Sequence, residues 1–253
     1  MVIPLTELVA HLDAYLRLPG CQDSSHNGLQ VEGRPTVRKI VAGVDASLEL
    51  FERAAAAAAD LVLVHHGLSW KDSLKQLRGL TARRLELLFS NGISLYASHL
   101  PLDAHPEAGN NARLADRLGL AGRRPFFTYG GVPIGVVGTL PRPLTAPELA
   151  ARLERELATR CLVIPGRAGE LRTLGVVSGG AGDAAEEAAA AGCDALVTGE
   201  ITHSHIHLFR ETGLTGIAAG HYATETLGVR ALLERLTRTF ALPGEFIDLP
   251  TGL

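Results

Sequence analysis

Two histidine and carboxylate pairs stand at matching places in the two halves of this chain of 253 residues. His99 is followed four residues later by Asp103, and His221 is followed four residues later by Glu225. The same 122 residues separate the two histidines and the two carboxylates. Imidazole nitrogen and carboxylate oxygen are ligands that divalent metal ions accept. We therefore predict a metal site to which both halves of the chain contribute.

A further segment adds two adjacent histidines, His65 and His66, directly before Gly67. Adjacent residues of a strand point to opposite faces, so both rings reach one ion only if the backbone turns. Two neighbouring ions suit the pair better, because each ring then faces its own ion. A carboxylate that reaches both ions would hold them roughly 3.5 to 4 Å apart. The pattern favours two metal ions, with Asp103 and Glu225 as oxygen ligands.

Each of these signals is weak by itself. Adjacent histidines at a strand end are often a hydrogen-bonded pair, and Pro101 rules out a regular helix that places His99 and Asp103 on one face. The prediction of a metal site rests instead on three separated segments, each of which places histidine or carboxylate at a predicted strand end.

The elements that position these residues occur in the same order twice. Strands are expected at residues 39–44, 61–64, 93–97, 174–178, 195–198 and 214–219. Helices are expected at residues 4–17, 47–59, 81–90, 146–158, 183–191 and 203–211. Alternating strands and helices are typical of parallel sheets covered by helices, and ligands of such sheets gather at the carboxyl ends of the strands.

We predict an α/β fold with two similar lobes that arose by internal duplication, mostly parallel sheets, and the metal site between the lobes. The lobes are placed at residues 1–124 and 125–253, with the segment 214–225 returning to the shared metal site. Residues 122–171 interrupt the repeat and are expected to begin the second lobe.

The composition excludes several classes of protein. Hydrophobic residues make up 46% of the chain, and the net charge of −3 argues against nucleic-acid binding. No segment resembles a signal peptide, and no apolar run reaches membrane-spanning length, so we expect a cytoplasmic protein with no membrane contact. Cys21, Cys161 and Cys193 are widely spaced, which indicates neither a disulfide framework nor a thiolate metal site.

Three other features could support the metal site or have a structural role only. Glu200 can hydrogen-bond a metal-ligating ring from behind. The glycine-rich segment 179–183 is expected to be a tight turn, although its backbone amides can also cradle a phosphate. His203, His205 and His207 are expected on a solvated helix, with one of them as an alternative proton carrier.

Seven motifs are spread over the chain: Asn27-Gly-Leu-Gln30, Gly43-Val-Asp-Ala-Ser47, His65-His-Gly67, Ser98-His-Leu-Pro-Leu-Asp103, Gly109-Asn-Asn111, Thr198-Gly-Glu200 and Gly220-His-Tyr-Ala-Thr-Glu225. Together they resemble the Nif-three-like dinuclear metal centre family, whose members are described as GTP cyclohydrolase I type 2 homologues. The resemblance covers essentially the whole chain. It is to the short form of the family, without the domain that longer members carry between the halves.

The resemblance implies that His65, His66, Asp103, His221 and Glu225 bind two divalent metal ions per subunit. Imidazole and oxygen ligands accept Zn, Mn, Fe, Ni or Co. It also implies two α/β lobes and a toroidal homohexamer. The implied activity is hydrolysis of GTP, a purine nucleotide, in which the imidazole ring of guanine opens and formate is released.

For that reaction, a metal-bound hydroxide is expected to attack C8 of the purine. His99 is the predicted proton carrier, because a neutral imidazole titrates near physiological pH. Two alternatives stay open: a metal-dependent phosphoesterase or amidohydrolase with another small-molecule substrate, and a non-enzymatic ring-shaped adaptor that its metals stabilise. A clamp around nucleic acid is opposed by the acidic balance.

Overall fold

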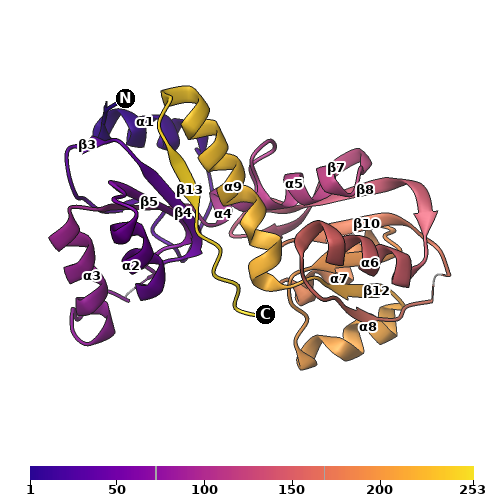
Figure 1. Cartoon of the computed structure of the whole chain (residues 1–253). Coiled ribbons are helices and arrows are strands. Elements are labelled where there is room, and N and C mark those ends of the chain that lie inside the picture. Colours follow the sequence, from indigo (N-terminus) through magenta and orange to yellow (C-terminus); the bar gives the residue numbers. More distant parts are fainter. Residues whose placement is uncertain (72, 168) are drawn as a thin grey trace. The chain divides into compact units, whose positions relative to one another are not determined.

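The computed structural model describes residues 1–71, 73–167 and 169–253 and divides into two compact units (Figure 1). The first unit consists of Met1–Leu102 and Gly228–Leu249, and the second of Asp103–Leu227 and Pro250–Leu253. Each unit therefore includes a segment from the end of the chain. Packing defines these units, and the lobes at residues 1–124 and 125–253 stay a prediction.

The first unit is built on a five-stranded sheet with the strand order β13-β4-β5-β6-β2. Its strands are β13 (Gly244–Phe246), β4 (Ile40–Asp45), β5 (Leu61–His66), β6 (Ser94–Ala97) and β2 (Gly28–Val31). The first four are parallel to their neighbours, and β2 is antiparallel to β6. Strands β4 and β5 are buried almost throughout, which explains their continuous apolar sequences.

Helices α2 (Leu48–Ala56) and α3 (Leu80–Asn91) make the two crossovers of this sheet. The side chain of Ser47 accepts a hydrogen bond from the backbone N–H of Leu50 and so caps α2. Gly92 ends α3 in the left-handed conformation that favours glycine. The unit also contains α1 (Leu5–Tyr15), the short ladder of β1 (Ile3–Pro4) with β3 (Thr36–Val37), and the last part of α9 (His221–Phe240).

The second unit is built on a six-stranded sheet with the strand order β7-β8-β10-β11-β12-β9. Its strands are β7 (Ala121–Tyr129), β8 (Val132–Leu144), β10 (Leu171–Val177), β11 (Ala195–Thr198), β12 (Thr215–Ala218) and β9 (Leu162–Ile164). Its helices are α5 (Asn110–Arg117), α6 (Ala146–Leu157), η1 (Gly182–Ala184), α7 (Ala185–Ala190), η2 (His203–His205) and α8 (Ile206–Thr212). No helix in the described ranges is both long and apolar enough to cross a membrane.

The strands and helices expected from sequence form at the expected places, but the prediction of mostly parallel sheets is wrong for the second unit. Within the described residues, β10, β11 and β12 are parallel, whereas β7, β8 and β9 add antiparallel pairings. The physical reason is the β7–β8 hairpin, whose two-residue turn is Gly130-Gly131. Both glycines have positive φ, which the tightest hairpin turns require.

Candidate functional site

His65 and His66 end strand β5, and their rings lie side by side in the first unit. The ring centroids are 4.6 Å apart, and the planes are inclined by 46°. His65 is fully buried, whereas the His66 side chain is 21% exposed. His66 pairs in register with Asp45 of the neighbouring strand β4, which brings these two side chains into contact.

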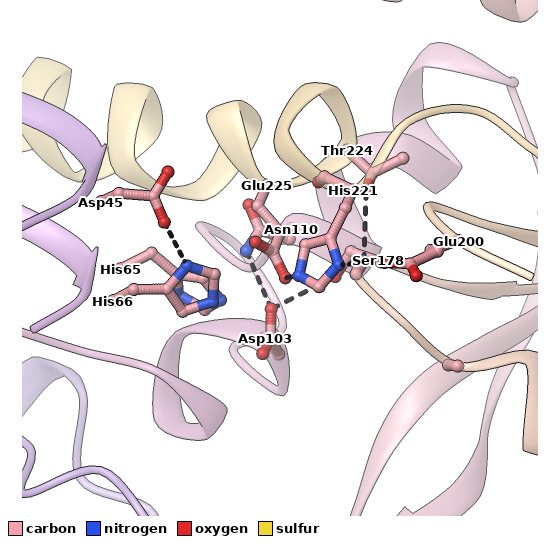
Figure 2. A network of polar contacts seen from close by, with 12 residues as sticks. Asp45, His65, His66, Asp103, Asn110, Ser178, Glu200, His221, Thr224 and Glu225 are labelled. Carbon is pink, nitrogen blue, oxygen red and sulfur yellow. Dashed lines mark hydrogen bonds and ion pairs between the residues drawn. The ribbon is translucent and has the colours of Figure 1, made fainter. Parts of the chain in front are cut away.

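The partners of the two rings define which nitrogen carries the proton. His65 Nδ1 lies 2.8 Å from the carbonyl oxygen of Ser98. His66 Nδ1 lies 2.8 Å from Asp45 Oδ1, a contact drawn in Figure 2. Both partners are oxygen acceptors, so Nδ1 is the donor in each ring and Nε2 carries the lone pair. A metal ligand needs that lone pair, so both histidines have the tautomer that binds metal through Nε2.

His99 joins the same group, although it lies outside the strands. Its ring centroid is 5.1 Å from that of His65 and 5.6 Å from that of His66. The ligand atoms of the three histidines all lie within 4.8 Å of one another, close enough to hold a metal ion. The structure therefore places the predicted proton carrier beside two of the predicted ligands.

A polar loop before β2 holds His99 in place, a role that sequence analysis did not predict for it. The Nδ1–H of His99 donates to Asp23 Oδ1 at 2.9 Å, and its backbone N–H donates to Asn27 Oδ1 at 2.7 Å. Burial by itself would raise the pKa of the Asp23 carboxyl, but hydrogen bonds from His99, Asn27 and Ser25 outweigh it and lower the pKa to about 2. Asp23 is therefore an anion at physiological pH and fixes the tautomer of His99.

Asp103 is buried in the second unit, and a network of polar side chains orients its carboxylate. Oδ1 accepts a hydrogen bond from Asn110 at 2.8 Å and another from the hydroxyl of Ser178 at 3.2 Å (Figure 2). Asn111 donates to the backbone carbonyl of Asp103 and accepts from the backbone N–H of Ser178. These contacts fix the direction in which the second carboxylate oxygen points.

His221 and Glu225 lie one turn apart at the start of α9, in the second unit. His221 Nε2 is 3.3 Å from Glu225 Oε1, and His221 Nδ1 is 3.2 Å from Glu200 Oε2. The contact with Glu225 raises the pKa of His221 to about 9, because it outweighs the opposite effect of burial, and Glu200 adds to it. A lone pair on Nε2 would face a carboxylate oxygen, so a cation belongs between the two atoms. That cation is a proton or a metal ion.

The match of 122 residues does not mark equivalent positions in the two units. Strand β6 ends at Ala97 and β12 ends at Ala218, so His99 is the second residue after its strand and His221 is the third after its own. His221 begins the long helix α9, whereas His99 directly precedes the single turn α4 (Leu100–Asp103). The interpretation of His99 and His221 as counterparts is corrected accordingly.

Comparison with known proteins identifies the family of the chain. The sequence profile of the Duf34/NIF3 (NGG1p interacting factor 3) family matches residues 3–250. The chain belongs to this family. Relatives include proteins named GTP cyclohydrolase 1 type 2 homolog from Deinococcus radiodurans, 45% identical over 98% of this chain and 94% of the relative, and from Pyrococcus horikoshii, 46% identical over 98% of each.

Solved structures agree with the membership in the NIF3 family. TTHA1606 from Thermus thermophilus is 44% identical and superposes with a TM-score of 0.88 over 99% of this chain and all of that one. The protein ybgI, described as of unknown function, is 40% identical with a TM-score of 0.92 over the same shares. These likenesses establish the fold along the whole NIF3-family chain.

The remaining features of this NIF3-family chain support the donors or lie on the surface. Glu200 hydrogen-bonds the His221 ring, as expected from sequence. The segment 179–183 bends at Gly179 and Gly180 and enters η1 at Gly182. Gly179 has a φ of +67°, and a Cβ there would collide with a Glu225 carboxylate oxygen. His203 and His207 are exposed on η2 and α8, as expected for a solvated helix.

Proposed function

We propose that this protein is a divalent-metal-dependent hydrolase in which His65, His66, Asp103, His221 and Glu225 bind two ions per subunit. One observation carries the proposal, and it recurs in both units. The Nδ1 atom of each of the three histidines faces an oxygen acceptor, which leaves Nε2 of His65 and His66 to offer a lone pair to a metal. Nε2 of His221 faces Glu225 Oε1, where a proton or a metal ion must lie between the two atoms. Metal-ligating histidines almost always have such an oxygen partner, which fixes the ring and increases its basicity.

The donor set fits divalent ions by its chemistry. It combines imidazole with carboxylate and contains no thiolate, a set that accepts Zn, Mn, Fe, Ni or Co. Glu225 and Asp103 are buried carboxylates, and burial of an anion is favourable only beside a compensating cation or donor. Bound divalent ions supply Lewis acidity and lower the pKa of water.

His99 is proposed to carry protons during the reaction. Because Nδ1 donates to the ionised Asp23, Nε2 is the ring atom that takes up and releases a proton. The arrangement resembles the use of a buried aspartate to orient a catalytic histidine in hydrolases. Asp23 holds the ring, and Asn27 holds the backbone of the same residue.

The substrate is proposed to be a purine nucleotide such as GTP. This step is supported by the names of relatives that are 45% and 46% identical, each a GTP cyclohydrolase 1 type 2 homolog. One water adds to C8 and the bond from C8 to a ring nitrogen breaks, and a second water releases the formyl group as formate. Assembly as a homohexameric ring stays a prediction, which the mass of the particle in solution tests.

The experiment is formate release from GTP by protein reconstituted with Mn, Fe or Zn. Asp103→Asn is compared with Asp116→Asn, whose side chain is 48% exposed on α5. Metal-dependent release that only the Asp103 change removes supports the proposal. Silence with two ions bound contradicts GTP as substrate and directs the assay to phosphate esters and amides, or to an adaptor role. A wild-type protein that binds no divalent ion contradicts the metal centre itself.

We also infer that the two sheets descend from an internal duplication. Asp60 and Asp194 support this inference, because they directly precede the parallel strands β5 and β11. The Asp60 carboxylate accepts the backbone N–H of Arg38, just before β4, and that of Asp194 accepts those of Arg172 and Thr173 near the start of β10. The backbone N–H of each aspartate also donates to that preceding segment, and its carbonyl accepts from the next parallel strand. A duplicated module would place ligands at the same sheet edge twice.

A further inference from the structure

Trp70 is the sole tryptophan of the chain and lies half-buried beside the histidine group of the first unit. Its ring centroid is 4.9 Å from that of His99, with the planes inclined by 69°, and 5.9 Å from that of His66. The indole is therefore an apolar, planar surface at the edge of a polar group of metal-binding side chains. Such a surface suits the flat ring of a ligand.

The indole is held before any ligand arrives. Its Nε1–H donates to the carbonyl oxygen of Gly67 at 2.7 Å, and the backbone N–H of Trp70 donates to Ser73 Oγ at 2.9 Å. An isolated β-bridge pairs Trp70 with Ser25, two residues beyond Asp23. Because the side chain is already ordered, stacking a ring on it loses little conformational entropy.

We propose that Trp70 is the stacking surface for the purine base of the substrate, an inference that rests on the proposed function for the class of substrate. Aromatic side chains stack on nucleobases because both present flat π faces. A base that stacks on this indole lies beside His99, the proposed proton carrier, and beside His66, a proposed ligand. Trp70 thus positions the ring that reacts, while the histidines and carboxylates act on it.

Because the chain has one tryptophan, its fluorescence reports on this surface directly. Zn-loaded protein is titrated with guanosine, GTP, ribose 5-phosphate and tripolyphosphate, and N-acetyltryptophanamide is titrated in parallel to correct for absorption. We expect saturable quenching by guanosine and GTP and none by the two compounds that lack a base. Equal quenching by tripolyphosphate, or GTP that binds in equilibrium dialysis without quenching, overturns the proposal.

Variants separate stacking from the proposed reaction. Trp70→Leu is expected to keep both metal ions and to weaken binding of GTP by about tenfold, whereas Trp70→Phe retains most of the affinity. A Leu variant with unchanged affinity or KM overturns the stacking role even if GTP is hydrolysed. If no metal form hydrolyses GTP, the proposed function fails, while quenching by guanosine still decides the role of Trp70. If the Leu variant does not fold, the wild-type titrations and the Phe variant decide it.

Discussion

The two units present different chemistry at the ends of similar parallel strands. In the first unit the donors are imidazoles, namely His65, His66 and His99, which lie close to one another. In the second, the two buried carboxylates Asp103 and Glu225 accompany one candidate ligand histidine, His221. In both units an oxygen acceptor contacts the Nδ1 atom of each of these histidines. One α/β frame can therefore supply imidazole nitrogen ligands at one sheet and carboxylate oxygen ligands at another.

The difference extends to the residues behind the donors. Asp23 and Asp45 orient rings in the first unit through their side-chain oxygens, whereas neutral Asn110 and Ser178 orient the carboxylate of Asp103 in the second. An imidazole that binds metal through one nitrogen is oriented by a hydrogen-bond acceptor at its other N–H. A carboxylate ligand is oriented by groups that donate hydrogen bonds to its oxygens. The supporting residues thus follow from the charge of the ligand that they hold.

The largest expected effect comes from removing one ligand in each unit. His66→Ala and His221→Ala are each expected to lower metal affinity by more than about a hundredfold, because losing a ligand costs more than losing its hydrogen-bond partner. His203→Ala is the matched control, since His203 is exposed on η2. Metal content after dialysis measures the effect. Two ions retained by either ligand variant would break the claim that both units contribute.

Asp45→Asn and Glu200→Gln test the oxygen acceptors of the two units with the same kind of change. Each removes a negative charge behind one proposed ligand, His66 or His221, and keeps the shape of the side chain. Metal affinity is expected to fall by roughly 10- to 100-fold in both, with the fold unchanged. Competition with a chromophoric chelator measures it. Affinities equal to that of the wild type would show that the acceptors do not tune the ligands.

Substitution of Asp60 and of Asp194 compares how much the two aspartates, one in each unit, contribute to the stability of the fold. The side chain of Asp60 is 1% exposed and accepts hydrogen bonds from the backbone and guanidinium of Arg38. Asp194 accepts the backbone N–H groups of Arg172 and Thr173. Asp60→Asn is expected to lower the free energy of unfolding by about 2 kcal/mol and Asp194→Asn by about 1 kcal/mol. Urea unfolding measures both, and equal losses would contradict the difference.

The effect of Asp60 depends on pH in a defined direction. Burial would raise the pKa of its carboxyl, but the hydrogen bonds and charge of Arg38 outweigh burial and lower it. A carboxyl whose pKa is lower in the folded state stabilises the fold above its unfolded pKa of about 3.9, and the stabilisation is lost as pH falls through the folded pKa. The stability gap between wild type and Asp60→Asn is therefore constant from pH 7 to about pH 5 and shrinks below about pH 4. A gap that widens on acidification would refute this account.

The smallest expected effect compares two glycines with positive φ in the second unit. A Cβ at Gly192 meets no atom within 4 Å, whereas one at Gly179 collides with a Glu225 carboxylate oxygen. Gly192→Ala is expected to cost about 1 kcal/mol from backbone strain. Gly179→Ala is expected to lower the free energy of unfolding by up to about 1 kcal/mol more than Gly192→Ala does, because the end of the Glu225 side chain can move out of the way. It is also expected to weaken metal binding. Equal metal affinity in the two variants would contradict the proposal that Gly179 leaves room for the Glu225 carboxylate to bind metal.

The repeated strands and helices could be predicted from sequence because buried parallel strands and their crossover helices leave strong local patterns. The β7–β8 hairpin was missed although Gly130-Gly131 between two β-rich segments is a known hairpin signal. The sequence pattern predicts residues 122–171 to be an interruption of the repeat, and that interpretation hides the hairpin signal. From sequence, the parallel pattern of the first unit is predicted for the second as well. There the hairpin strands β7 and β8 and the edge strand β9 pair antiparallel to their neighbours.

The candidate ligands stood out because three separated segments each place histidine or carboxylate at a predicted strand end. Their supports did not, since Asp23 and Ser178 lie 76 and 75 positions from their partners in sequence, and all three supports, Asn110 included, belong to types common in loops. Only the fold brings Asp23 to His99 over 76 positions of the chain. The numerical match of 122 residues between His99 and His221 arose from segments of unequal length, so spacing by itself misaligned them.

A crystal structure of the protein loaded with Mn or Zn, with anomalous difference maps at the metal edge, tests the central claim most directly. We predict two anomalous peaks per subunit, with His65, His66 and His221 bound through Nε2 and with Asp103 and Glu225 as oxygen ligands. Coordination through Nδ1, or metal ions bound by other residues while these five stay uncoordinated, would contradict the account.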